Sequence, residues 1–158
     1  MWLARVYSGI LRALMWLRRS FLLVSTAWTA AIPLAAFAAS RVDTSSMAYG
    51  FALAIYVVGR LVCHQLPARS FHLWTTPLPV CARCTGIYVG AALTALGFRG
   101  RLVTTRSNPK VVLLAALVPT AATLVFEWTT GIMPSHWIRA LAGVPMGAAV
   151  AWAIGMVN

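Results

Sequence analysis

The chain has 158 residues, of which 61% are hydrophobic and only 9% are charged. A soluble domain carries about a quarter charged residues, so this composition excludes a water-soluble globule and favours several membrane-spanning helices in one small domain. The formal net charge of +11 would favour nucleic acid in a soluble protein, but the basic residues here mostly flank apolar runs, so we expect membrane lipids as partners and no nucleic acid.

Residues 1–19 are predicted to form an amphipathic helix that lies flat in the membrane interface. Arg5, Arg12 and Arg19 recur every seven residues, and apolar side chains fill most of the remaining positions. A helix of this kind can turn its arginines toward lipid phosphates while its apolar face enters the bilayer. A short basic segment on the cytoplasmic side of the membrane would explain the same pattern equally well.

Residues 20–39 form an uncharged apolar run that is long enough to cross about 30 Å of hydrocarbon. The pair Arg18-Arg19 ahead of this run and the small residues near its end also fit a twin-arginine export signal, in which residues 1–38 would be removed. The run is longer than the apolar part of such a signal and further apolar runs follow, so we favour a retained first span.

Four further apolar runs are predicted to be helices, and a cysteine-rich loop separates the first two of them. Pro67, Pro77 and Pro79 exclude a continuous helix within this loop. We therefore predict an all-α, polytopic membrane protein with four to five transmembrane helices, in which residues 20–158 form a single helical domain with a Cys/His loop at 63–84. The four later helices are expected at 47–62, 84–98, 111–130 and 136–157.

Two stripes of small residues are expected to bring two of these helices close together. Gly86 and Gly90 lie four residues apart in the third helix, and the stripe continues at Thr94. Gly143 and Gly147 begin a second stripe, which continues at four-residue intervals along the fifth helix. Small side chains at this spacing allow helix backbones to approach closely, so we expect the two stripes to pack against each other.

Helix alternation predicts that the sparse polar residues meet at one face of the membrane, which we call the site face. The second helix ends at Cys63 and the third begins near Cys84, so both of these ends lie on that face. The fourth helix returns to it with Glu127 about one turn before its end, and Arg139 follows about one turn into the fifth helix. An unpaired charge in hydrocarbon is costly, so Glu127 requires a cationic or hydrogen-bond-donating partner, which Arg139 or Arg83 could supply.

The distribution of basic residues leaves the orientation of the site face open. The positive-inside rule places the segments richest in Lys and Arg in the cytoplasm. An N-terminal basic group would draw the site face toward the cytoplasm, whereas a later basic group would draw the opposite face there. The first group is Arg5, Arg12, Arg18 and Arg19, and the second is Arg99, Arg101, Arg106 and Lys110.

The loop and the helix that follows it carry a set of residues suited to a metal ion. Cys81 and Cys84 are separated by two residues at a predicted helix start, where the helix dipole favours thiolates. Cys63, together with His64 or His72, could complete four ligands, and His64 is favoured because His72 lies outside the core of the motif. Thiolate and imidazole ligands suit zinc first, with iron or copper less favoured. We therefore predict a zinc-type site formed by Cys63, His64, Cys81 and Cys84.

Other functions fit parts of the same pattern. A C-x-x-C pair at a helix start is typical of thiol oxidoreductases, and Cys63 could resolve a mixed disulfide, although no thioredoxin-like βαβ pattern surrounds the pair. The cysteines could instead be small buried apolar residues. The chain could also be a structural subunit of a membrane complex, with another membrane protein or a second copy of itself as its partner.

Four charged residues near the cysteines are candidates for binding an anion or for supporting the metal ligands. Arg69, Arg83 and Arg139 beside a helix N-terminus could hold a phosphate or carboxylate, such as a lipid headgroup, with Glu127 as a counter-ion. A membrane enzyme that acts on a phosphorylated lipid is therefore a further alternative. His136 is expected to cap the fifth helix rather than to bind a metal.

The cysteines belong to a longer signature, which begins Cys63-His64-Gln65-Leu66-Pro67 and ends Cys81-Ala82-Arg83-Cys84-Thr85-Gly86. It resembles the signature of a family of small prokaryotic integral membrane proteins that is known as a domain of unknown function, and the resemblance covers roughly residues 47–150. That family tends to have Asp where Glu127 stands and Asn where His136 stands. The resemblance implies a multi-pass protein of a prokaryotic plasma membrane with a shared polar site, and it supplies no activity.

Overall fold

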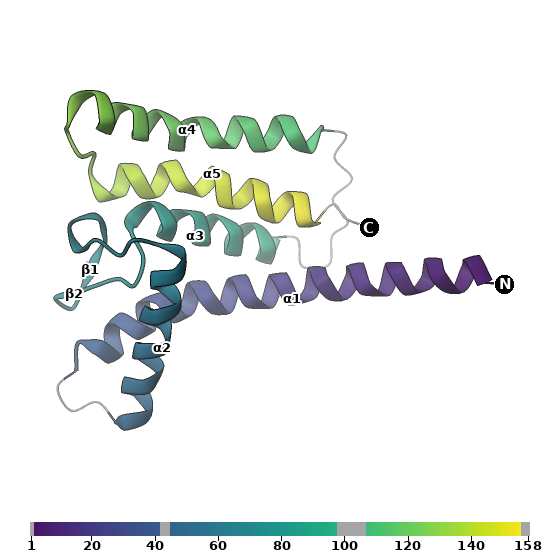
Figure 1. The fold of residues 1–158 in the computed structure, drawn as a ribbon, viewed down its shortest axis with the longest axis horizontal. Helices are drawn as coiled ribbons and strands as arrows, with labels where there is room; N and C mark the ends of the chain where they lie inside the picture. The colour runs from purple at the N-terminus through teal and green to yellow at the C-terminus, as the bar shows by residue number, and fades with distance from the viewer. Residues whose placement is uncertain (1, 42–44, 98–106, 156–158) are drawn as a thin grey trace.

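The computed structural model describes residues 2–41, 45–97 and 107–155. The described part contains five α-helices, one short 3-10 turn and one two-stranded hairpin, so the predicted all-α class is confirmed (Figure 1). In chain order the elements are α1 (Trp2–Ala39), α2 (Ser46–Val62), η1 (Pro67–Arg69), β1 (His72–Leu73), β2 (Thr76–Pro77), α3 (Ala82–Gly97), α4 (Pro109–Thr130) and α5 (His136–Gly155).

Helix α1 is continuous from Trp2 to Ala39, with no break between the predicted interfacial helix and the predicted first span. Pro33 lies inside the helix without ending it. Hydroxyl groups near its middle donate back to carbonyls one turn earlier, as Thr29 Oγ1 does to the Ser25 carbonyl at 2.7 Å. At 1.5 Å per residue α1 is roughly 57 Å long, well beyond the thickness of a hydrocarbon core. The interfacial position of its first half stays a prediction.

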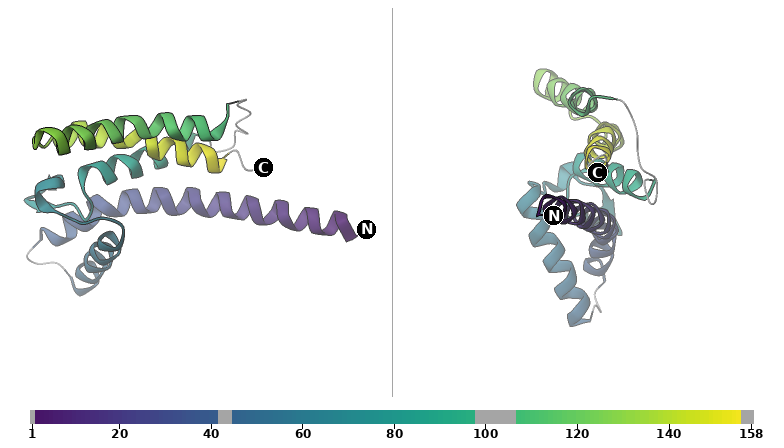
Figure 2. Two further views of the ribbon diagram at one scale, coloured as in Figure 1. Left: turned by 45° about the horizontal axis from the view of Figure 1, so that its top comes forward. Right: turned by 90° about the vertical axis from the view of Figure 1, so that its right-hand side faces the viewer.

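Four helices run side by side along the long axis of the molecule, and α2 lies across that axis (Figures 1 and 2). The C-terminal ends of α1 and α4 and the N-terminal ends of α3 and α5 lie together at one end of this bundle, next to the β1–β2 hairpin. We call this the site end. The other ends of α3, α4 and α5 lie at the opposite end, and the start of α1 extends beyond them.

The position of α2 corrects the predicted topology, in which the second helix crosses the membrane and α1 ends at the face opposite the site. Helix α2 starts after the N-cap Ser45, whose side chain accepts a hydrogen bond from the Ala48 N–H, and it ends at Cys63 in extended backbone. Because α2 lies crosswise, α1 ends at the site end. Hydrophobic periodicity indicates a helix but carries no information on its tilt, so the crosswise position of α2 cannot be predicted from the sequence pattern.

Three described helices are long and apolar enough to cross a membrane, namely Arg12–Ala39 within α1, all of α4 and all of α5. Helices α2 and α3 have 17 and 16 residues in the described part of the chain, which is short for a span. The structure therefore supports three of the four to five predicted spans. Large apolar side chains on the outer sides of the bundle, such as Leu93, Leu114 and Leu141, are exposed, as lipid-facing residues would be.

The most extensive contact in the bundle joins α3 to α5, which run parallel to each other. A Cβ atom on Gly86 would collide with the backbone of Ala140, and one on Gly147 would collide with the backbone of Ile87. Two further glycines, one on each helix, face the partner backbone in the same way. The prediction that the two small-residue stripes pack against each other is confirmed.

Helices α4 and α1 flank this central pair. On one side, Thr120 Oγ1 of α4 donates to the Ala142 carbonyl of α5 at 2.8 Å. On the other side, Thr29 Oγ1 of α1 donates to the Tyr88 carbonyl of α3 at 3.0 Å, and the ring of Trp28 meets that of Tyr88 edge-on. The four lengthwise helices thus follow the order α4, α5, α3, α1 (Figure 1).

Gly147→Ala is expected to destabilise the bundle, because the added methyl group has no room at the contact between α3 and α5. Overpacking of a dense contact costs about 1–3 kcal/mol, so the thermal midpoint of the protein in detergent should fall. Gly97→Ala is the matched control, since nothing lies within 4 Å of the position of its Cβ atom. Equal effects of the two substitutions would contradict the packing described above.

Candidate metal centre

Three cysteine thiols gather at the site end although two of them lie far from the third in the sequence. Cys63 follows the last residue of α2, Cys81 precedes the first residue of α3, and Cys84 lies in the first turn of α3. Their Sγ atoms all lie within 4.8 Å of one another. All three are free thiols, of which Cys63 is buried and the other two are partly exposed. This thiol cluster could hold a metal ion.

An apolar cluster beneath the thiols holds the loop in place. Ile32 and Ala36 of α1 pack with Leu78 and Val80 of the loop, and Cys63 belongs to the same cluster. These loop residues are buried because the segment folds back onto the helices instead of extending away from them. The unusually apolar content of the loop is explained by this contact.

A set of hydrogen bonds, which we call the clamp, joins the two segments that carry Cys63 and Cys81. Gln65 adopts a positive φ of 47°, and its Nε2 donates to the Tyr56 carbonyl at 2.6 Å and to the Pro79 carbonyl at 2.7 Å. The Tyr56 hydroxyl donates to the carbonyl of Pro77. A Cβ atom at position 59 would strike the Pro79 carbonyl and Gln65 Nε2, so a glycine is required there.

The clamp residues Gln65, Tyr56 and Gly59 are absent from the predicted site. Gln65 has a sequence signal, since it lies inside the Cys-His-Gln part of the signature. Tyr56 and Gly59 have none, because a tyrosine and a glycine within an apolar helix are ordinary membrane-helix residues. Only the position of the folded loop shows their role.

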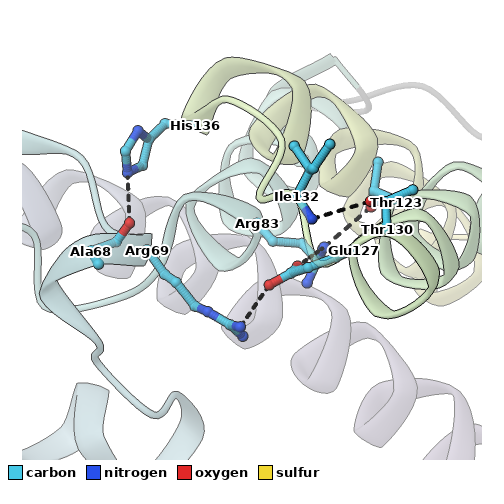
Figure 3. A network of polar contacts seen from close by, with 8 residues as sticks. All are labelled: Ala68, Arg69, Arg83, Thr123, Glu127, Thr130, Ile132 and His136. Atoms are coloured by element: carbon cyan, nitrogen blue, oxygen red, sulfur yellow. Dashed lines mark hydrogen bonds and ion pairs between the residues drawn. The ribbon is translucent and has the colours of Figure 1, made fainter.

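The histidines lie outside the thiol cluster. His64, the predicted fourth ligand, is exposed, and among the described residues the only group close enough together to hold a metal is the three cysteines. His72 is exposed in β1. His136 Nε2 lies 3.2 Å from the Ala68 carbonyl and its ring contacts that of Phe71, so it links the start of α5 to the loop (Figure 3).

The three thiols act strongly on one another. A hydrogen bond from the Cys84 thiol lowers the pKa of Cys81 from 9.0 to about 5, against the opposing effect of burial. The Cys84 backbone N–H, the Cys63 thiol and the charge of Arg139 also lower the pKa of Cys81. The Cys81 N–H in turn donates to Cys63 Sγ at 3.2 Å. The lowered pKa favours the thiolate form of Cys81, which is the form that binds metals.

A second polar group, which we call the arginine cluster, consists of Arg69, Arg83, Glu127 and Arg139. Glu127 is buried at 8% exposure, and its Oε1 lies 2.6 Å from Arg69 Nη2 while its Oε2 lies 3.9 Å from Arg83 Nη2 (Figure 3). Arg83 Nη2 also donates to Thr123 Oγ1 at 3.2 Å. Of the two partners predicted for Glu127, Arg83 is present, but Arg69 from the loop is closer.

Arg139 connects the two clusters. Its side chain is only 1% exposed. The charges of Glu127, Arg83, Cys81 and Arg69 all act on its guanidinium group. The thiol cluster and the arginine cluster are therefore parts of one polar region at the site end.

A family model described as "Predicted membrane protein (DUF2085)" matches residues 63–153, a segment that begins at Cys63 and contains every residue of the two clusters. The chain belongs to this family. The resemblance expected from the Cys-His-Gln signature is thereby confirmed. The DUF2085 description names a membrane protein and gives no activity.

Two relatives of this DUF2085 protein come from archaea, and both are named only as uncharacterized proteins. A protein of Methanocaldococcus jannaschii is 36% identical over 81 residues, which are 50% of this chain and 52% of the relative. A protein of Methanothermobacter thermautotrophicus is 34% identical over 98 residues, which are 58% of this chain and 83% of the relative. The chain thus spans about half the length of the first relative and most of the second. No solved structure matches it.

Gly59→Ala is expected to open the clamp, because the methyl group would displace the Pro79 carbonyl or the Gln65 side chain. The thiols of the cluster should then react faster with a maleimide, as measured by mass spectrometry, and stability should fall by about 1–3 kcal/mol. Gly50→Ala in the same helix is the control, since nothing lies within 4 Å of its added Cβ atom. A wild-type rate of alkylation in both variants would show that the clamp does not hold the thiols.

Proposed function

We propose that the chain is a multi-pass protein of a prokaryotic plasma membrane that holds a zinc-type metal ion in its thiol cluster. The observation that carries this proposal is that the three Sγ atoms lie within 4.8 Å of one another. Zinc–sulfur bonds of about 2.3 Å in a tetrahedron set the sulfur atoms roughly 3.8 Å apart, so a small inward movement of the thiols would suffice. Iron and copper are the less favoured candidates for the same ligands.

The fourth coordination position decides what kind of centre this is. A structural zinc site is closed by four protein ligands, whereas a catalytic site keeps one position for water or substrate. His64 is the predicted fourth ligand, and its exposed ring would have to turn inward to reach the ion. Without His64, three thiolates leave one position open.

Charged and polar groups around the thiols support a negatively charged metal–thiolate centre. Three thiolates outweigh the charge of one Zn²⁺ ion, so donors and cations nearby stabilise the assembly. The Cys81 N–H donates to Cys63 Sγ, and the positive charge of Arg139 acts on Cys81. Arg83 and Glu127 belong to the same polar region and would keep Arg139 in position.

We further propose that α1, α3, α4 and α5 cross the membrane and that the site end faces the outside of the cell. Arg18 and Arg19 lie about 30 Å along α1 from its C-terminal end, near the end of the bundle opposite the site end. Helix α3 ends and helix α4 starts at that same opposite end. The connection between them carries the second basic group in its sequence. Both basic groups thus favour a cytoplasmic location for this end under the positive-inside rule.

Two further points concern the position of the site end relative to the bilayer and to the outside of the cell. Trp74, Trp128 and Trp137 are exposed and belong to elements at the site end, where they suit the headgroup level of a bilayer. Compartments outside the cytoplasm are oxidising, so an odd number of unpaired thiols there requires protection. A bound metal ion would provide that protection.

A membrane enzyme that uses thiol redox chemistry is the second candidate. The same mutual distance that suits a metal would let two thiols form a disulfide and leave the third to exchange with it. A structural subunit of a membrane complex is the third candidate, in which the polar region would serve assembly. Metal content separates the first candidate from the other two.

The purified protein is expected to contain about one metal ion per chain by elemental mass spectrometry. Cys63→Ser, Cys81→Ser and Cys84→Ser should each abolish this content, because two remaining thiolates hold zinc far more weakly. His72→Ala, which alters an exposed histidine outside the cluster, should leave it unchanged. His64→Ala distinguishes a closed site, which would lose the metal, from an open one, which would keep it. Metal-free protein with a disulfide that cycles under mild reductant would favour the redox candidate.

Labelling of intact cells with a membrane-impermeant maleimide tests the orientation. A cysteine placed at the site end by His72→Cys should be labelled in intact cells, above the background of the unsubstituted protein. A cysteine at the opposite end, introduced by Lys110→Cys, should be labelled only after the cells are permeabilised. Both positions are exposed, so burial does not limit the reaction. The reverse pattern would place the thiol cluster on the cytoplasmic side.

A further inference from the structure

Two guanidinium groups at the site end carry buried N–H groups that have no hydrogen-bond acceptor among the described residues. Arg139 is 1% exposed, and its Nε and Nη1 atoms are buried without a partner. The Nε atom of Arg83, a side chain at 12% exposure, is in the same state. A buried donor without an acceptor is unfavourable, and more so when it carries a charge. No described side chain accepts from these N–H groups, and both oxygens of the neighbouring Glu127 are likewise buried without a hydrogen bond.

The charges of the arginine cluster are also unbalanced. Three guanidinium groups, those of Arg69, Arg83 and Arg139, act together with a single carboxylate, Glu127. That carboxylate is engaged by Arg69 at 2.6 Å, whereas Arg83 lies 3.9 Å from its other oxygen. Even with Glu127 fully paired, two positive charges remain. A metal–tris-thiolate centre beside them would offset only one.

The backbone adds to this positive potential. Arg83 is the second residue of α3 and Arg139 is the fourth residue of α5, so both side chains start from helix N-termini. Helices α3 and α5 run parallel and pack backbone to backbone, which sets their positive ends side by side. Helix N-termini attract anions through their free N–H groups and their dipoles.

Water could accept hydrogen bonds from the buried N–H groups, but it would not neutralise the two positive charges. An oxyanion would do both. Its several oxygen atoms match the planar donors of arginine, which is the side chain best suited to two-point recognition of phosphate or carboxylate. The location at one end of an apolar bundle would place such a ligand at the headgroup level of a bilayer.

We infer that Arg83 and Arg139 form a binding site for one oxyanion, such as the phosphate group of a lipid headgroup or a free phosphate ion. Arg69 is 39% exposed and pairs with Glu127. It would therefore line the outer side of the site and hold the carboxylate away from the ligand. The inference goes beyond the metal centre and does not depend on it, because the unpaired donors and the excess charge belong to the arginines.

The test has two arms, one for each source of phosphate. In the first, wild-type protein and Arg83→Gln are washed extensively in detergent, and the lipid phosphorus retained per chain is measured. In the second, lipid-free protein is titrated with inorganic phosphate and followed by its thermal midpoint, with sodium chloride at equal ionic strength as the control. Arg60→Gln, which removes an exposed arginine of α2, is the matched control variant.

In the first arm, a headgroup site is identified if the wild type retains about one more lipid phosphate per chain than Arg83→Gln. Phosphate binding that weakens about tenfold or more in Arg83→Gln would identify a site for free phosphate. Arg139→Lys keeps the charge but loses the planar donors, so it should weaken binding by a similar factor. This variant replaces Arg83→Gln in both arms if Arg83→Gln fails to fold.

The inference is overturned if neither lipid phosphate nor inorganic phosphate binding decreases when Arg83 or Arg139 is replaced. It is also overturned if Arg60→Gln lowers binding as much as Arg83→Gln does. The metal content of the wild-type protein, measured on the same samples, reports on the metal centre independently of phosphate binding. A failure of the anion site is thereby kept separate from a failure of the metal centre.

Discussion

The backbone-to-backbone contact between α3 and α5 is the constraint on which the rest of the structure depends. In a bilayer, apolar side chains gain little by leaving lipid for protein, so small residues and close packing drive helix association. The glycines of this contact let the two backbones touch at defined positions along the two helices. As a result Arg83 and Cys84 of one helix begin beside Arg139 of the other, and the polar region at the site end is gathered by packing, without the need for ionic attraction.

The buried charges of the polar region destabilise the fold, and the loop between α2 and α3 reduces this free-energy cost. A buried ion pair contributes little net stability once desolvation is counted, but an unpaired buried charge is far worse. The loop supplies Arg69 to the carboxylate of Glu127, and the clamp formed by Gln65 holds the loop at the required place. Ionisable residues retained inside an apolar bundle at such a cost generally mark a functional site.

Much of the architecture is predictable from hydrophobic periodicity and residue spacing. The expected starts of the third and fourth helices differ from the observed ones by two residues, and the two small-residue stripes meet as expected. Spacing and helix alternation also bring the cysteines, Glu127 and Arg139 to one end. The direction of α2 was missed because apolar composition defines a helix and not its tilt. The Arg69–Glu127 pair was missed because a loop arginine can equally well extend to the headgroups.

The crosswise position of α2 has a consequence for the shape of the molecule in a bilayer. Four lengthwise helices give a similar cross-section at every depth, but α2 adds its width at the site end alone, with exposed apolar residues such as Met47 and Leu61 along it. In the membrane arrangement proposed above, the footprint of the protein would therefore be larger in one leaflet than in the other. A wedge of this kind displaces lipids asymmetrically, and its energy depends on the local curvature of the membrane.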